Sequence, residues 1–345
     1  MFGTKRPSIT STCSRSDPAR STRAMSSASA AKSAEKVEGA IFMACFSYTI
    51  RRGRTAVKPS VILAAGTLTA RRKLRHDWWE GKIDPVAGSP LIAIEGVARR
   101  YVTTSGAVDA LRDVSLSVEA GEFCTIIGPS GCGKSTLLGM LGGLVVPDAG
   151  RILIAGQAVT GPDPRAVATV FQDPGLFPWR TVVENIEFGL ELQGVARDER
   201  RRAATELLGP LGLRGFAPKY PRELSGGMRQ RVAIGRALAI DTPIVLMDEP
   251  FGALDEQTRM LMGEWLLEVW RRTRKTVIFV THSLHEALAL SGRVAVMTAR
   301  PGRIKSVLAL PMPYPRAMES LEIVALRAKL WHEIREESAR AMSEA

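Results

Sequence analysis

The stretch Gly128–Thr136, with the sequence GPSGCGKST, constrains the fold of this chain more than any other feature. The short apolar run Phe123–Ile127 precedes it and indicates a buried strand, whereas Thr136–Leu141 indicates a helix. Glycines at such a junction let successive backbone N–H groups turn toward a phosphate, next to the positive end of the helix dipole. Lys134 supplies a cation for the β- and γ-phosphates, and the Ser135 hydroxyl can ligate Mg²⁺. The stretch therefore predicts a nucleoside triphosphate site.

Every residue of this stretch, which we call the phosphate loop, is predicted to line the nucleotide site: Gly128, Pro129, Ser130, Gly131, Cys132, Gly133, Lys134, Ser135 and Thr136. Cys132 lies at the start of the predicted helix, where the helix dipole is expected to lower the pKa of a thiol. We therefore expect thiol reagents to inactivate the protein and bound nucleotide to protect it.

The length and the composition limit what the chain can be. A chain of 345 residues with 45% hydrophobic residues can form one large globular domain with appendages. No apolar run approaches the roughly 20 residues that a membrane-spanning helix needs. We therefore do not expect the chain itself to form a membrane channel. The four cysteines show neither metal-ligand spacing nor a disulfide framework, which fits a reducing compartment.

The basic charge is concentrated at the start of the chain. Residues 1–90 carry 16 Lys and Arg against 6 Asp and Glu, which accounts for +10 of the net charge of +12. Residues 1–88 are rich in Ser, Ala, Arg and Thr, and we expect a basic, disordered extension there. This extension is either a solvated segment, or the product of an upstream start codon, or a basic arm that binds nucleic acid or anionic lipid. Its composition favours the first two interpretations.

A second anion site is predicted at Leu224–Gln230, where a helix begins. Ser225 is the expected N-cap, and Gly226 and Gly227 expose backbone N–H groups at the positive end of the helix dipole. Unlike the phosphate loop, this site contains no lysine.

Two carboxylates follow the buried strand predicted at Ile244–Met247. At the carboxyl end of a parallel strand, where ligands bind, Asp248 can hold Mg²⁺ through water and Glu249 can orient or deprotonate a water molecule. A salt-bridged acidic turn is the alternative interpretation. His282 follows the strand predicted at Thr276–Val280 and is a candidate for contact with the γ-phosphate, although a lone histidine is more often structural.

Helical signals separate these motifs. A capping box at Thr181–Glu184 predicts a helix through Leu192, and Asp198 is expected to cap a helix that runs to Leu208. Because helices dominate here and strands dominate on both sides, we expect a helical insertion at about residues 173–239.

Further elements complete the expected domain. Five more strands are predicted, at Leu91–Val97, Val108–Val118, Arg151–Ile154, Ala168–Phe171 and Val294–Met297. Asp255 is the expected cap of a helix whose apolar face contains Leu261, Met262, Trp265, Leu266 and Val269. Residues 311–345 form a C-terminal tail, in which one amphipathic helix is marked by Ile323, Leu326, Leu330 and Ile334.

These motifs, taken in order over roughly Leu91–Lys305, resemble the ATP-binding subunits of ABC transporters. The resemblance implies an α/β fold, with a P-loop NTPase core, an antiparallel β subdomain and a helical subdomain, over residues 91–310. It implies that Tyr101 stacks on adenine and that Ser135, Gln172 and Asp248 hold Mg²⁺ and its waters. Glu249 would polarise the attacking water, and His282 would contact the γ-phosphate. The second anion site would close on the ATP of a partner copy, with Asp255 coupling the two sites; its residues are Ser225, Gly226, Gly227 and Gln230.

The resemblance also implies partners and a location. It predicts a head-to-tail homodimer on a membrane permease, with an indirect link to a substrate-binding protein, at the cytoplasmic face of the cell inner membrane. Within the family, Val170–Val182 and Arg300–Arg303 look most like importers of nitrate, aliphatic sulfonates and taurine. The alternative is a soluble ABC ATPase that acts on nucleic acid through the basic arm. It is disfavoured, because the residues between Ser135 and Leu224 show no sustained heptads for the expected coiled coil.

Overall fold

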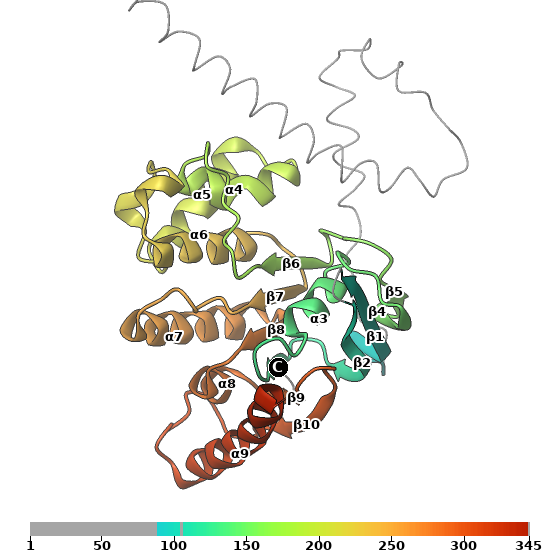
Figure 1. Cartoon of the computed structure of the whole chain (residues 1–345). Helices are drawn as coiled ribbons and strands as arrows, with labels where there is room; N and C mark the ends of the chain where they lie inside the picture. Colours follow the sequence, from blue (N-terminus) through green and yellow to red (C-terminus); the bar gives the residue numbers. More distant parts are fainter. Residues whose placement is uncertain (1–87, 104–105, 344–345) are drawn as a thin grey trace, which may run out of the picture. The chain divides into compact units, whose positions relative to one another are not determined.

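The structure is a computed structural model that describes residues 88–103 and 106–343 (Figure 1). All of these residues belong to one compact unit, Thr67–Ala345. Apart from Gly88, the predicted extension 1–88 lies outside the described residues.

A six-stranded sheet forms the centre of the unit, in the order β10-β9-β3-β8-β7-β6. Five neighbouring strands run parallel, and β10 runs antiparallel to β9. The strands are β3 (Phe123–Ile127), β6 (Val167–Val170), β7 (Ile244–Asp248), β8 (Thr276–Thr281), β9 (Arg293–Met297) and β10 (Ile304–Ala309). The sequence analysis placed the last core strand at Val294–Met297 and did not predict β10.

The central strands are buried because both faces of this sheet are covered. Phe123 of β3 and Phe279 of β8 pack into one hydrophobic cluster with residues of α4, α6 and α7. The alternate residues Cys124 and Ile278 pack into a second cluster with residues of α3 and of the other sheet. Burial on two faces explains why these strands read as continuous apolar runs.

A second, antiparallel sheet has the order β2-β1-β4-β5. Its strands are β1 (Ile92–Thr103), β2 (Gly106–Val118), β4 (Ala149–Ile154) and β5 (Gln157–Ala158). The first strand continues well beyond the predicted Val97. Register shifts between Ile94 and Arg100 break its alternating pattern, which is why the sequence pattern underestimated its length.

Helices flank and extend the main sheet (Figure 1). They are α3 (Lys134–Leu141), α4 (Val182–Leu192), α5 (Arg197–Leu208), α6 (Gly226–Leu238), α7 (Glu256–Thr273), α8 (Leu284–Leu290) and α9 (Leu321–Ser343), with 3-10 turns η2 (Arg214–Phe216) and η3 (Pro221–Glu223). Figure 1 shows α4, α5 and α6 grouped together beside β6, and the region 173–239 contains helices and turns but no strand among its described residues.

Three predicted helix caps are present in the structure, and one is wrong. Thr181 forms the predicted capping box, in which its Oγ1 accepts from the backbone N–H of Glu184. Ser225 and Asp255 cap α6 and α7 through their side chains. The cap predicted at Asp198 is wrong. Asp198 is the second residue of α5, and the N-cap is Ala196, which has no capping side chain.

The buried face of α7 differs from the predicted one. Leu261 is 66% exposed, whereas Trp270, which the sequence analysis did not include, is buried. Trp270 packs edge-on against Phe123, with ring centroids 5.8 Å apart. Trp265 is partly buried against the same cluster. The four apolar residues predicted for the last helix do pack inward, in a cluster with β9 and α8.

The described residues contain no helix with the length and apolar character that a bilayer span requires.

Candidate nucleotide-binding site

The predicted site residues of the core follow neighbouring parallel strands. Gly128 comes directly after β3, Asp248 is the last residue of β7, and His282 comes directly after β8. Because β3, β8 and β7 are adjacent and parallel, their carboxyl ends lie at one edge of the sheet. Gln172 follows β6, the next strand along this edge, after one intervening residue. The topology therefore brings these four sequence-distant residues to a common edge.

The phosphate loop is a tight backbone turn that leads into α3. Gly131 and Gly133 have φ of +77° and +100°, a region that favours glycine. A Cβ on Gly133 would also lie 2.9 Å from the carbonyl oxygen of Ala110. The buried side chain of Lys134 folds back, so that its Nζ donates to the carbonyls of Gly128 and Pro129 at 2.9 Å each. The loop thus places the ammonium group of Lys134 close to the amino end of α3.

Asp248 and Ser135 form the candidate magnesium site. Ser135 lies near the carboxylate of Asp248, which is buried at the end of β7, and its hydroxyl favours the charged form of that carboxylate. Burial raises the pKa of Asp248 above its ordinary value, and the hydrogen bond from Ser135 opposes this rise. A hydroxyl and a carboxylate are oxygen ligands of the kind that Mg²⁺ prefers, so the residues present fit the ion.

Glu249 has a constrained backbone at the same edge. Its φ of 45° is in the left-handed region, which a non-glycine residue adopts at a cost of about 1–3 kcal/mol. The strand holds it there, because its N–H donates to the carbonyl of Val280 at 2.9 Å. Its Oε2 lies 3.3 Å from Nδ1 of His282, which is 62% exposed. The pair can orient a water molecule and a phosphate oxygen together.

The second anion site is an exposed helix start. The Oγ of Ser225 accepts from the backbone N–H of Met228 at 3.2 Å. A Cβ on Gly227 would meet the side chain of Leu254 at 3.0 Å, so this glycine lets α6 approach the segment before Asp255. A Cβ on Gly226 would have no neighbour closer than 3.9 Å. The backbone N–H groups at the start of α6 are therefore accessible to an anion from outside.

Gln230, which the sequence analysis grouped with the nucleotide-binding residues, has its side chain in the core of the described structure. Its side chain is 1% exposed, and its Nε2 donates to the carbonyl of Phe171 at 3.2 Å. It therefore connects α6 to the residue before Gln172. Gln230 lies one helical turn after Gly226 on the same face of α6, at the level where the helix packs against the segment that contains Phe171.

Tyr101 lies in β1 and is half-buried. The guanidinium of Arg99 lies 4.9 Å from the centroid of its ring. The guanidinium of Arg99 thus covers one face of the Tyr101 ring.

Two residues that the sequence analysis missed hold the loop Asp173–Arg180. Arg236 of α6 donates to the carbonyls of Pro174 and Gly175 at 2.8 Å each. Asn185 of α4 is fully buried and accepts from the backbone N–H of Phe177 at 2.8 Å. A buried asparagine on the apolar face of a helix is the signal that could have identified this contact.

The environment of Cys132 contradicts the expectation that its thiol is reactive. Its side chain is fully buried, and burial raises the pKa of the thiol despite the opposing attraction of Lys134. The dipole argument failed because it omitted the loss of solvent around the sulfur.

We expect the Cys132 thiol to react at least ~10-fold more slowly than an exposed thiol, because a raised pKa leaves less thiolate at any pH below it. The measurement is the rate of disulfide exchange with an aromatic disulfide reagent, in a variant in which Cys13, Cys45 and Cys124 are replaced by serine. The same variant in urea is the control. Rapid modification of the native protein that ATP prevents would contradict this expectation.

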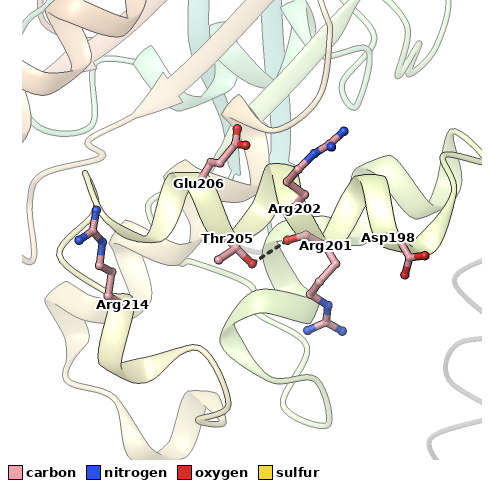
Figure 2. A pocket seen from close by; sticks show the side chains of 6 residues that line it. All are labelled: Asp198, Arg201, Arg202, Thr205, Glu206 and Arg214. Carbon is pink, nitrogen blue, oxygen red and sulfur yellow. Dashed lines mark hydrogen bonds between the residues drawn. The ribbon is translucent and has the colours of Figure 1, made fainter.

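A separate hollow of about 500 Å³ lies on α5 and contains none of the predicted site residues. Figure 2 shows that its charged side chains point in different directions rather than toward one point. Its lining mixes both charges: Asp198, Arg201, Arg202, Thr205, Glu206 and Arg214. We assign no ligand to it.

The fold and the phosphate loop define a P-loop ATPase, and comparisons with known proteins specify its family. The family model described as ABC transporter matches residues 111–252. An uncharacterised ABC transporter ATP-binding protein of Methanocaldococcus jannaschii is 45% identical over 73% of this chain and 94% of its own length. The chain belongs to the ABC transporter ATP-binding proteins and is an ATPase.

Other relatives have names that state a substrate. The nitrate import ATP-binding protein of Synechocystis sp. is 46% identical over 64% of this chain and 83% of its own. The aliphatic sulfonates import ATP-binding protein of Bacillus cereus is 42% identical over 69% of this chain and 94% of its own. A solved ATP-binding cassette, a dimer bound to ADP and phosphate, matches with a TM-score of 0.60 and 33% identity over 64% of this chain and all of that chain.

Proposed function

We propose that this chain is the ATP-hydrolysing subunit of an importer of small anions, of the nitrate, sulfonate or taurine type. The observation that carries the proposal is the identity of more than 40% to subunits named for nitrate and aliphatic sulfonate import. The subunit would act as a peripheral protein at the cytoplasmic face of the cell inner membrane. It would bind a polytopic permease directly and serve a substrate-binding protein indirectly.

Hydrolysis requires charge on both sides of the triphosphate, and one copy of the chain provides one side. Lys134 and the amides of the phosphate loop neutralise the β- and γ-phosphates. The exposed start of α6 offers further N–H donors, at Gly226 and Gly227, but it belongs to a different helix. We propose that two copies assemble head to tail, so that Ser225, Gly226 and Gly227 of each close on the ATP of the other. Asp255 would then couple the two sites.

The residues at the sheet edge would have different roles in ATP hydrolysis. Ser135, Asp248 and Gln172 would hold Mg²⁺ and its waters, and the ion would neutralise charge that develops on the phosphate oxygens. Glu249 accepts a hydrogen bond from the attacking water and polarises it. His282 holds the γ-phosphate and keeps Glu249 oriented. Tyr101 would stack on the adenine.

The proposal is tested by co-expression with the permease subunit of a nitrate or sulfonate importer. We expect the chain to fractionate with membranes only when that protein is present, and vesicles that contain both, with a binding protein, to take up nitrate or a sulfonate when ATP is supplied. The matched control is Glu249→Gln, which should bind the membrane but support no uptake. A chain that stays in the soluble fraction would contradict the proposal. We do not propose the nucleic-acid alternative, since the named relatives are importers.

A further inference from the structure

The C-terminal helix α9 makes a buried polar contact with the turn beside the phosphate loop. Glu337, near the end of this helix, is 1% exposed. Its Oε2 accepts from the backbone N–H of Ala299 at 3.0 Å, and its Oε1 accepts from Nζ of Lys305 at 2.8 Å. Ala299 follows β9 and Lys305 lies in β10, so one carboxylate holds both ends of the connection between these strands. Figure 1 shows α9 alongside them.

The two ends of the connection Thr298–Arg303, which Glu337 contacts, are hydrogen-bonded to each other. The N–H of Thr298 donates to the carbonyl of Arg303 at 2.9 Å, and the N–H of Arg303 donates to Oγ1 of Thr298 at 3.0 Å. These contacts fix both ends of the turn and link them to each other. Gly302 precedes Arg303 in this turn, so we expect a shift at Ala299 to be transmitted to Gly302 through the hydrogen bonds between Thr298 and Arg303.

Gly302 packs directly against the phosphate loop. A Cβ at this position would overlap the carbonyl oxygen of Cys132, which leaves no space for a side chain between the two backbones. The N–H of Gly302 also donates to the carbonyl of Ala110 at 3.0 Å. The same carbonyl lies against Gly133 on the other side of Cys132. The turn and β2 thus support the outer surface of the loop, at the residues that precede Lys134.

We propose that Glu337 is a positioning residue for the nucleotide site, which fixes the turn Thr298–Arg303 and, through Gly302, the backbone of the phosphate loop. The amides of that loop must lie within a narrow range of geometry to bind phosphate, and a buried charged side chain is a rigid support. Glu337 touches no part of the nucleotide. Although burial raises the pKa of Glu337, the hydrogen bonds from Lys305 and Ala299 outweigh this and hold it below its ordinary value, so the side chain keeps its charge.

The test is the ATPase kinetics of Glu337→Ala in the full chain. We expect the KM for ATP to rise about ten-fold, the size of effect that loss of a hydrogen bond to a charged group produces, while kcat changes less than about two-fold. A purely structural role for Glu337 would lower the melting temperature without changing the KM. The stabilisation by added ATP, measured as a shift of the melting temperature, should fall in parallel with affinity.

Glu336→Gln is the matched control. Glu336 also accepts from Nζ of Lys305, at 2.8 Å, but makes no contact with the turn, so its loss should leave the KM for ATP unchanged. An unchanged KM in folded Glu337→Ala, or an equal rise in Glu336→Gln, would overturn the proposal.

If Glu337→Ala does not fold, Glu337→Gln keeps the volume and weakens the contacts. We then expect a rise in the KM for ATP of about three-fold. An unchanged value in this variant would again overturn the proposal.

Discussion

Replacing Glu249 by glutamine is expected to slow ATP hydrolysis by a factor of about 10²–10⁴ while ATP still binds. Glutamine has the same size and keeps the strained backbone at φ of 45°, but its amide cannot accept a proton from the attacking water. Lys134 and the phosphate loop are unchanged, so affinity for ATP should stay within about two-fold of the original. The bound ATP should hold two copies together.

Three measurements check this prediction: single-turnover hydrolysis, equilibrium binding of ATP, and the oligomeric state with ATP by light scattering. Glu264→Gln is the matched control, because Glu264 is an exposed glutamate on α7. It should hydrolyse ATP at the original rate. Normal turnover by Glu249→Gln would remove Glu249 from its proposed role.

Replacing Gly226 by aspartate is expected to reduce ATPase activity by about 10³–10⁵, the effect of losing a charge-stabilising group in other nucleotidases. The start of α6 is exposed, and a carboxylate there would face the phosphates bound by the partner copy. The loss should come from repulsion and not from unfolding, since the nearest atom to a Cβ at this position, on the side chain of Arg229, is 3.9 Å away. An acidic residue in the first turn also favours the helix itself.

Gly226→Ala separates charge from volume. It adds the same Cβ without the charge, so its ATPase activity should stay within about ten-fold of the original. Activity should be compared over a range of protein concentrations, with the dimer fraction measured in ATP. Full activity in Gly226→Asp, or an equal loss in Gly226→Ala, would argue against a site shared between two copies.

The parts of the structure that the sequence predicted are those that local chemistry determines. The caps at Thr181, Ser225 and Asp255 were found because each needs only a side chain and a backbone N–H three residues away. The order of motifs likewise placed Asp248 and His282 at the carboxyl ends of neighbouring strands. The roles of these residues in hydrolysis remain predictions.

The predictions that failed depend on tertiary contacts. Cys132 lies where a dipole favours a thiolate, yet its side chain packs into a hydrophobic cluster, and this burial outweighs the dipole and raises the pKa of the thiol. The burial of Gln230 was not visible in the motif, because it depends on the packing of α6 against the segment that contains Phe171. The exposure of Leu261 depends on which face of α7 meets Phe123, and periodicity alone does not distinguish two overlapping apolar faces.

The loop after β6 is held by its main chain. Gln230 and Arg236 bind carbonyl oxygens of Phe171, Pro174 and Gly175, and these atoms are present whichever residues occupy the positions. Mutations that alter the side chains of this loop therefore leave its attachment to α6 intact. The side chains of this loop can therefore change during evolution while Gln230 and Arg236 continue to attach its backbone to α6.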